Sequence, residues 1–292
     1  MQAKSRVNSS PRTRTLRKGT VAVLVVALGV LSFGLLAYRL QSHSNSVSAQ
    51  LRSLDEERFS KALKQITTNE ISVLLEMLAA KDSATKTKLL ELLEKAPWLQ
   101  IEVRTAEAFH YGALVGFEAL GSNAVSAIPQ LGKMLMNGDQ DGGHTAAFCL
   151  AVIGCESIPT LVEALTNSNY QVRYNAAAAL GSMESKAKDA IPSLLQALKD
   201  NHQLVRYSAA RALGEIRMEP LIVVPALMAA LDDQDETVMW NAAIALGEFG
   251  VKAKQAVPKL SVLAKGNDPR ASPIALESLK KIDPEASAKA GK

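Results

Sequence analysis

Aromatic residues and cysteines are scarce in this chain of 292 residues. Only 4% of the residues are Phe, Trp or Tyr and two are cysteines, although 48% are hydrophobic. A core of the size that this length allows must therefore be built from Ala, Leu, Val and Ile. Ala has the highest helix propensity and lets neighbouring helices approach closely, so the composition favours an all-α fold.

The two cysteines, Cys149 and Cys155, form no CxxC motif, so the sequence predicts neither a zinc site nor a redox centre. Their spacing puts them on roughly opposite sides of a continuous helix, and a disulfide would require the helix to end between them. Outside the cytoplasm such a bond is chemically allowed. We expect two buried free thiols, with the disulfide as the alternative.

Recognisable catalytic motifs are also absent. The chain contains no P-loop, GxGxxG or GxSxG motif. No two histidines have the spacing of metal ligands; they are His43, His110, His144 and His202. The segment GDQDGGH (138–144) begins like a calcium loop, but the twelfth position from Asp139 is Leu150 where a bidentate Glu is needed, so we expect a turn there. We therefore expect no enzymatic activity, cofactor, metal or small-molecule substrate.

Positive charge is concentrated at one end of the chain. The net charge is +4, yet residues 1–19 hold six cations and no acid, so residues 20–292 carry a net charge of −2. A nucleic-acid groove needs an excess of Lys and Arg to neutralise phosphates. We therefore expect that this chain does not bind nucleic acid. A nucleic-acid-binding solenoid is the alternative function.

A long apolar run follows this basic segment. Residues 20–38 (TVAVLVVALGVLSFGLLAY) contain no charge and would span about 28 Å as a helix, close to the thickness of a bilayer. The sequence predicts a transmembrane signal-anchor helix with residues 1–19 in the cytoplasm, because cations favour that side. Residues 39–53 would form a polar tether, and the remainder would lie outside the cytoplasm, in the periplasm.

Two other interpretations of residues 20–38 stay open. A cleaved signal peptide would release a secreted protein, although its apolar stretch is usually shorter and the nearest small-residue site, residues 47–49, lies well beyond the run. A buried helix of a soluble domain is the third interpretation.

One phrase recurs every thirty-three residues. The copies are VRYNAAAALGSM (172–183), VRYSAARALGEI (205–216) and VMWNAAIALGEF (238–249). Their apolar residues fall at i, i+4, i+8 and i+11, which predicts one buried face of an α-helix.

A second phrase follows each copy at the same interval. Its copies are AIPSLLQAL (190–198), VVPALMAAL (223–231) and AVPKLSVLA (256–264). Proline is tolerated in the first turn of a helix, so we expect a second helix to start at Pro192, Pro225 and Pro258. Each unit is then an antiparallel helix pair that cannot bury its own apolar face, and stacked neighbours bury it instead.

The sequence therefore predicts an all-α solenoid over residues 112–284. Residues 54–111 have helical periods without a matching phrase, and we expect divergent N-terminal helical repeats there. Residues 272–286 predict a lone first helix that caps the solenoid, and residues 285–292 form a tail. We expect the second helices to line the inner surface, where Glu163, Gln196, Ala229 and Val262 share neither charge nor shape.

These phrases resemble the HEAT-repeat family, particularly the short bacterial repeats first associated with phycobilisome lyases. The resemblance rests on the AALG-like first helices, the Ile/Val-Pro starts of the second helices, and an acidic or amide residue six positions before an arginine. The last feature occurs as Asn167 with Arg173 and as Asp200 with Arg206, whereas Asp233 is followed by Met239. The resemblance implies a HEAT/armadillo-like superhelix whose loops are tied together by a ladder of these pairs. By analogy alone it also implies a chromophore (bilin) lyase as an alternative function.

Solenoids offer extended surfaces, so we expect a non-catalytic scaffold that binds a protein partner. Aromatic residues share one repeat position, away from the apolar face of each first helix: His144, Tyr174, Tyr207 and Trp240. Two interpretations stay open. The rings cover the adjacent repeat, or they form an exposed aromatic ladder that binds a partner.

Overall fold

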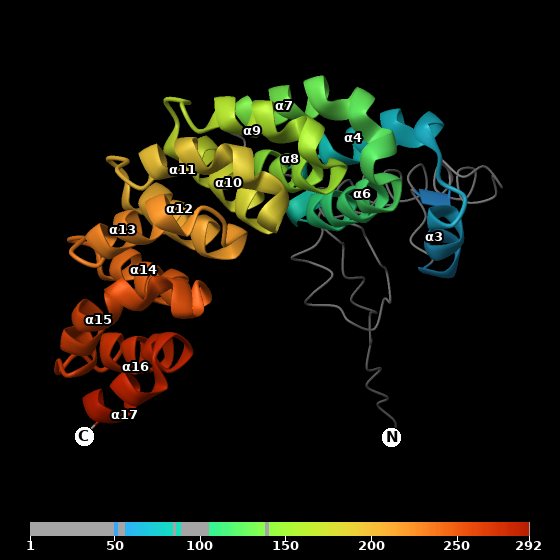
Figure 1. Cartoon of the computed structure of the whole chain (residues 1–292). Coiled ribbons are helices and arrows are strands. Elements are labelled where there is room, and N and C mark those ends of the chain that lie inside the picture. Colours follow the sequence, from blue (N-terminus) through green and yellow to red (C-terminus); the bar gives the residue numbers. More distant parts are fainter. Residues whose placement is uncertain (1–49, 52–55, 84–85, 89–104, 138–139, 292) are drawn as a thin grey trace, which may run out of the picture.

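The computed structural model describes residues 50–51, 56–83, 86–88, 105–137 and 140–291. Within these residues the secondary structure is helical and contains no β-strand, which confirms the all-α prediction for this part of the chain (Figure 1). The N-terminal part contains α3 (Glu56–Leu63), a 3-10 turn η1 (Thr68–Glu70) and α4 (Ile71–Leu78). No helix in the described ranges is long and apolar enough to cross a membrane, and the predicted anchor at residues 20–38 lies outside them.

The rest of the described chain is a succession of helix pairs. The first helices are α6 (Ala106–Leu120), α8 (Gln140–Ile153), α10 (Tyr170–Ser182), α12 (Gln203–Ile216), α14 (Glu236–Glu248) and α16 (Ala271–Ile282). The second helices are α7 (Ile128–Met136), α9 (Ile158–Ala164), α11 (Ile191–Ala197), α13 (Pro220–Ala230), α15 (Val257–Ala264) and α17 (Pro284–Ala290). Short 3-10 segments connect four of these pairs: η3 (Gly121–Ala127), η4 (Cys155–Ser157), η5 (Glu184–Ala190) and η6 (Gly250–Ala256).

Prolines begin the second helices largely as predicted, with one exception. Pro192 and Pro258 lie in the first turn of α11 and α15. In the fourth pair, α13 begins at Pro220, and Pro225 lies inside the helix. The left-handed residues Arg217 and Glu219 turn the chain so sharply that Pro220 can serve as the first helical residue, and helix replaces the 3-10 connector.

Three other sequence-based boundaries need correction. The predicted start of the solenoid at residue 112 falls inside α6, because this helix has the packing of a first helix without the AALG phrase. The predicted turn at 138–144 is helical from Gln140 onward, since α8 begins there. The last first helix is not alone: α17 follows it, begins at Pro284 with the Asp283 cap, and packs against α15 and α16.

Stacking joins the pairs into an arch. Each first helix from α6 to α16 packs on the next first helix in the chain. Figure 1 shows the first helices along the inner side of the arch and the second helices along its outer side. The expectation that second helices line the inner surface is therefore wrong. The first helices approach one another more closely through their small residues, so the arch bends toward their side.

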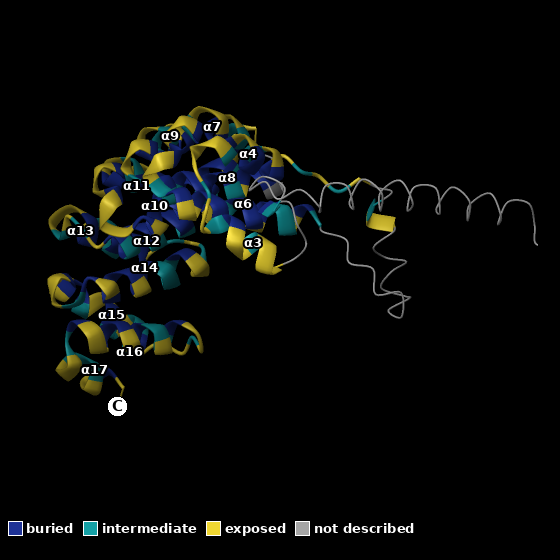
Figure 2. Ribbon diagram, turned by 90° about the vertical axis from the view of Figure 1, so that its right-hand side faces the viewer, coloured by how far each residue is buried: buried dark blue, intermediate teal, exposed yellow. Residues whose placement is uncertain are grey.

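Small residues let the first helices approach closely. A Cβ atom built on Gly214 would lie 2.7 Å from the Cα of Ala245, and one on Gly181 would lie 2.9 Å from the Cα of Ala212. The same glycine of the AALG phrase recurs in α14 at Gly247, against Ser278. The buried residues run through the interior between the two helix layers, and the second helices carry both buried and exposed residues (Figure 2).

Candidate partner-binding surface

The loops that precede the first helices repeat one hydrogen-bonded turn. Asp200 Oδ1 accepts from the backbone N–H of His202, and Asp233 Oδ1 accepts from that of Asp235, each at 2.9 Å. Asn167 makes the same contact with the N–H of Asn169. Asp and Asn favour this turn because their short side chains bond the backbone two residues on. The loop shape therefore follows directly from the residue at this repeat position.

Arginines bridge these turns from one repeat to the next. Arg173 donates through Nε and Nη2 to the two carboxylate oxygens of Asp200, both at 2.7 Å, and Arg206 binds Asp233 in the same way at 2.7 and 2.8 Å. Each arginine also donates through Nη1 to a carbonyl of its own loop, that of Asn167 for Arg173 and that of Asp200 for Arg206.

The ladder residues named from the sequence thus do meet, but in a different pairing. The carboxylate that each arginine binds lies 27 residues later, in the following repeat, and the residue six positions earlier contributes its backbone carbonyl. Asp233 is therefore part of the ladder, because it accepts from Arg206, although Met239 follows it. The sequence contains the signal for this pairing: Asp200 and Asp233 each lie 27 residues after an arginine.

Bidentate contact changes the acidity of both carboxyl groups. Burial raises the pKa of Asp200, and the hydrogen bonds from Arg173 and the backbone of His202 outweigh it, so the pKa lies below its ordinary value. The hydrogen bond from Arg206 is the main reason that the pKa of Asp233 is also lowered. Both groups are ionised at neutral pH, and the ladder ties adjacent loops into one rigid edge.

The aromatic position lies on the open side of the first-helix layer. The rings at this position differ in exposure: His144 is exposed, whereas Tyr174, Tyr207 and Trp240 are half-buried. Tyr111 of α6, which sequence reasoning missed, lies thirty-three residues before His144 and is 69% exposed. Extending the repeat interval upstream from His144 would have found it. The row of five rings, called the ring row below, therefore places one ring on each first helix from α6 to α14.

Local contacts hold several of these rings in place. The ring centres of His144 and Phe148 are 5.0 Å apart, and partial burial lowers the pKa of His144 below its ordinary value. The guanidinium of Arg270, from the next repeat, lies 5.3 Å from the centre of the Trp240 ring. Tyr174 packs against the core. The rings thus cover neighbouring structure with one side and keep part of their surface open.

Below the ring row, the inner face changes character along the arch. One turn further along each first helix lie Val115, Phe148, Ala178, Arg211 and Ile244. Another turn on lie Ala119, Val152, Ser182, Glu215 and Glu248. These positions are uncharged on α6, α8 and α10, and charges appear only from α12 onward.

The charges of the second half are largely paired with one another. Arg211 lies 3.1 Å from Glu215, and Lys281 lies 2.9 Å from Glu248. Burial raises the pKa of Glu215, and one of its carboxylate oxygens is buried without a hydrogen-bond partner. At these two repeat positions the first helices therefore carry no charge from α6 to α10 and largely paired charges from α12 onward, whereas Lys81, Asp82 and Glu107 lie beside Tyr111.

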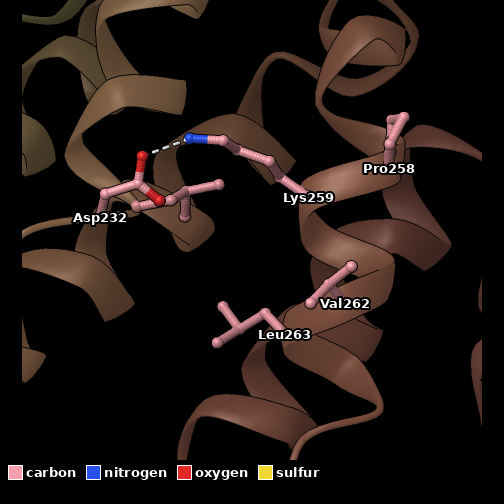
Figure 3. Close-up of a pocket in the computed structure, with 6 residues that line it drawn as sticks. Asp232, Pro258, Lys259, Val262 and Leu263 are labelled. Atoms are coloured by element: carbon pink, nitrogen blue, oxygen red, sulfur yellow. Dashed lines mark hydrogen bonds and ion pairs between the residues drawn. The ribbon is translucent and has the colours of Figure 1, made fainter.

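Hollows on the described surface include two that bear on ligand binding. One, of about 1450 Å³, opens beside the N-terminal end of the ring row and is lined by Tyr111, His144 and Phe148 among others. The other, of about 350 Å³, lies between the end of α13 and α15, on the outer side. In Figure 3 the ammonium of Lys259 reaches Asp232 across this outer hollow, above Val262 and Leu263. Because its two charged groups pair with each other, the outer hollow offers little to orient a ligand.

The remaining candidate groups are separate. Within the described residues no three His, Cys, Asp or Glu side chains gather closely enough to hold a metal ion. Cys149 and Cys155 are both free thiols, and α8 ends between them. Cys149 is buried, which raises its pKa, whereas Cys155 is exposed, so the expectation that both are buried is wrong for Cys155.

Residues 128–214 and 191–280 match the sequence model of the family described as HEAT repeats, and together they span more than half of the chain. No curated protein sequence matches significantly. An engineered protein of known crystal structure is similar, with 22% identity over 85% of this chain and 98% of that chain and a TM-score of 0.42. Computationally designed armadillo repeat proteins for modular peptide recognition show 20% identity over 81% of this chain and 98% of theirs, with a TM-score of 0.40. Another designed armadillo repeat protein has 18% identity, the same coverage and a TM-score of 0.40.

Proposed function

The chain belongs to the HEAT-repeat family, and on this premise we propose that it is a membrane-tethered, non-catalytic scaffold that binds a protein partner on the inner face of its arch. The observation that carries the proposal is the ring row, an aromatic side chain on every first helix from α6 to α14 with part of its surface open. Aromatic residues supply much of the binding energy at protein interfaces.

The proposed tether is the apolar segment at residues 20–38, with residues 1–19 in the cytoplasm and the repeats on the other side of the membrane. This arrangement would hold the arch close to the bilayer through the polar residues 39–53. Cleavage of the segment would instead release the same scaffold as a secreted protein.

Capture of the native partner tests the binding surface. The full chain, solubilised from its native membranes, is compared with the variant Tyr174→Ser/Tyr207→Ser/Trp240→Ser. We expect the variant to lose capture while its melting temperature stays close to that of the wild type. A variant that melts several degrees lower, and whose folded fraction still captures the partner, would show that the rings only pack against their own repeats.

Two further variants separate binding from stability. Tyr111→Ser removes a ring that is 69% exposed, so it should weaken capture without affecting folding. Leu221→Ser removes an apolar side chain that is 88% exposed but lies on α13 of the outer layer, and it should leave capture unchanged.

A further inference from the structure

The connector of the fourth helix pair departs from the pattern of its two neighbours. The connectors before and after it read ESKAKDA (184–190) and GVKAKQA (250–256), whereas this one reads RMEPLIV (217–223). At two positions an apolar residue of this repeat replaces exposed polar residues of both neighbours: Leu221 replaces Lys188 and Lys254, and Ile222 replaces Asp189 and Gln255.

The replaced positions remain on the surface. Leu221 is 88% exposed and Ile222 is 50% exposed. Val251, on the segment η6 that packs against α13, is 75% exposed. We call Leu221, Ile222 and Val251 the connector patch. Large apolar side chains that lie exposed beside one another mark a surface that binds something apolar.

The backbone that presents the connector patch is strained. Arg217 and Glu219 have φ angles of 53° and 50°, in the left-handed region that residues other than glycine enter at a cost. At the position of Glu219 the neighbouring connectors hold Lys186 and Lys252, and neither has a positive φ. This repeat therefore contains an additional strained residue directly before the extra helical turn that carries Leu221 and Ile222. Such strain is typical of positions kept for function.

Positive charge borders the connector patch. Helix α13 carries no charged residue, and η6 carries Lys252 and Lys254 without an acid. Both lysines are exposed and form no ion pair with a described residue. Lys188, on the other side, pairs with Glu219 at 2.9 Å. The three connectors, residues 184–190, 217–223 and 250–256, hold five cations and three acids. A complementary surface is therefore apolar at its centre and anionic around it.

The surface of an anionic bilayer fits both features. Apolar side chains enter the boundary between headgroups and acyl chains, while lysines keep their charge at the level of the phosphates. The proposed anchor holds such a surface close to the arch. Residues 39–49 separate the apolar run from Gln50, the first described residue, and can span at most about 40 Å. At this high local concentration a small patch is enough for docking.

We propose that the connector patch docks the arch on the non-cytoplasmic leaflet of the bilayer that anchors the chain. Leu221 and Ile222 enter the headgroup boundary, and Lys252 and Lys254 bind lipid phosphates. The proposal rests on the membrane tether of the proposed function and adds the orientation of the arch on the membrane. Docking through the connectors and α13 leaves the ring row, which lies on the first helices, open to a protein partner.

Quenching by spin-labelled lipid tests the contact. The full chain is reconstituted in vesicles of equal parts phosphatidylglycerol and phosphatidylcholine, with a fluorophore attached beside the patch through Cys155→Ser/Gln255→Cys. The matched control carries it through Cys155→Ser/Val262→Cys, since Val262 is 75% exposed in the last turn of α15. We expect at least about threefold stronger quenching beside the patch, because an interfacial group lies only about 5–10 Å into the headgroup boundary.

A variant of the patch tests whether its apolar side chains make the contact. Leu221→Ser/Ile222→Ser should reduce quenching at position 255 to the level of the control, without a change in melting temperature, because both side chains are exposed. Circular dichroism verifies that the variant is folded. Quenching that persists in this folded variant would show that another surface touches the bilayer, and the proposal would be wrong.

Lysine variants test the contact with phosphates. Lys252→Gln/Lys254→Gln should weaken quenching at position 255 by about twofold or more, and phosphatidylcholine alone should have the same effect on the wild type. Lys199→Gln/Lys265→Gln is the matched control, with exposed lysines at the opposite ends of the second helices, and it should not change the quenching. Equal effects of the two lysine pairs would contradict the proposed contact.

Flotation of the vesicles separates docking from tethering. A full chain that does not float with the vesicles would overturn both the tether and the docking. A chain that floats, but whose two fluorophore positions are quenched equally, would keep the tether and overturn the docking. If Leu221→Ser abolishes a doubling of mass in detergent, or the capture of the native partner, then a second copy or that partner covers the patch. Either result would also overturn the proposal.

Discussion

At the scale of single residues, the ladder shows how one substitution can affect two repeats. Arg206 binds the carboxylate of Asp233 in the following repeat and the carbonyl of Asp200 in its own loop. The side chains of Arg206 and Asp233 are only 18% and 12% exposed, so water cannot easily replace a lost partner. Hydrogen bonds between such charged groups contribute more than those of a typical surface ion pair.

We predict that Asp233→Asn lowers the free energy of unfolding by about 2 kcal/mol at pH 7, because it leaves Arg206 without its carboxylate. Its effect should depend on pH. The pKa of Asp233 is lowered in the folded protein, so its stabilisation is present above the ordinary value of 3.8 and is lost as the pH falls through the folded value.

Urea denaturation between pH 7 and pH 3 measures the free energy of unfolding of the wild type and of Asp233→Asn. Wild-type stability should decline more steeply below about pH 5 than that of Asp233→Asn. Asp232→Asn is the matched control, since that side chain is 72% exposed, and it should behave like the wild type. Parallel pH profiles for wild type and Asp233→Asn would contradict the assigned role.

The ring row also contains a residue that the repeat interval alone did not reveal. Tyr111 belongs to a helix without the AALG phrase, and its position becomes clear only when α6 is seen to pack on α8 as a first helix. Tyr111 is 69% exposed, and it extends the row to a fifth helix.

At the scale of the helix, the AALG phrase is explained by close approach. Gly214 lies so near Ala245 that a Cβ atom would be 2.7 Å from both the Cα and the Cβ of that residue. A glycine inside a helix is usually unfavourable compared with alanine, by about 1 kcal/mol. Its recurrence at Gly181, Gly214 and Gly247 therefore reflects packing between first helices.

We predict that Gly214→Ala lowers the free energy of unfolding by about 1–3 kcal/mol, because the helices must move apart and the overpacking exceeds the gain in helix propensity. Thermal unfolding followed by circular dichroism measures the change. Gly143→Ala in α8 is the control: the nearest atoms would lie 3.6 Å from its Cβ, so this variant should be as stable as the wild type or more so. A stabilised Gly214→Ala would refute the close-approach account.

The connectors add a second helix-scale feature. A residue with positive φ lies one or two positions after the first helix in five repeats, at Gly121, Gly154, Glu184, Arg217 and Gly250. Glycine reaches this region without strain and other residues do so at a cost. The repeat geometry thus imposes the conformation even where the sequence does not supply glycine.

At the scale of the whole molecule, stacking turns the six described helix pairs from α6 to α17 into an arch with an inner and an outer surface. The ring row lies on the first helices, which form the inner layer in Figure 1, and the ladder joins the loops of neighbouring repeats. A partner segment that runs along this face contacts several repeats at once, so its affinity is distributed over the arch.

We predict that a reporter that is active only outside the cytoplasm will be active when fused after Lys292. The six cations of residues 1–19 should hold that end in the cytoplasm and place the repeats on the opposite side. The measurement is reporter activity normalised to the amount of fusion protein. The same fusion without residues 1–38 is the control and should be inactive, and a well-expressed but inactive full-length fusion would reverse the proposed topology.

The sequence by itself determined the helical class, the repeat interval and the buried face of each first helix. Val172, Ala176 and Leu180 are buried as their spacing predicts, because the period of an α-helix relates sequence position directly to direction. The starts of the second helices at Pro192 and Pro258 were likewise predictable, since proline favours the first turn of a helix.

Only the tertiary structure decided which layer faces inward and which residues meet between repeats. The ladder joins Arg173 to Asp200 and Arg206 to Asp233; the interval of 27 residues is present in the sequence, but no local rule distinguishes this pairing from contacts within a single loop. The curvature of the arch depends on how closely all the first helices approach, which is a sum of packing contacts across repeats. For this reason the inner surface was assigned to the wrong helices from sequence, whereas the helices themselves were predicted.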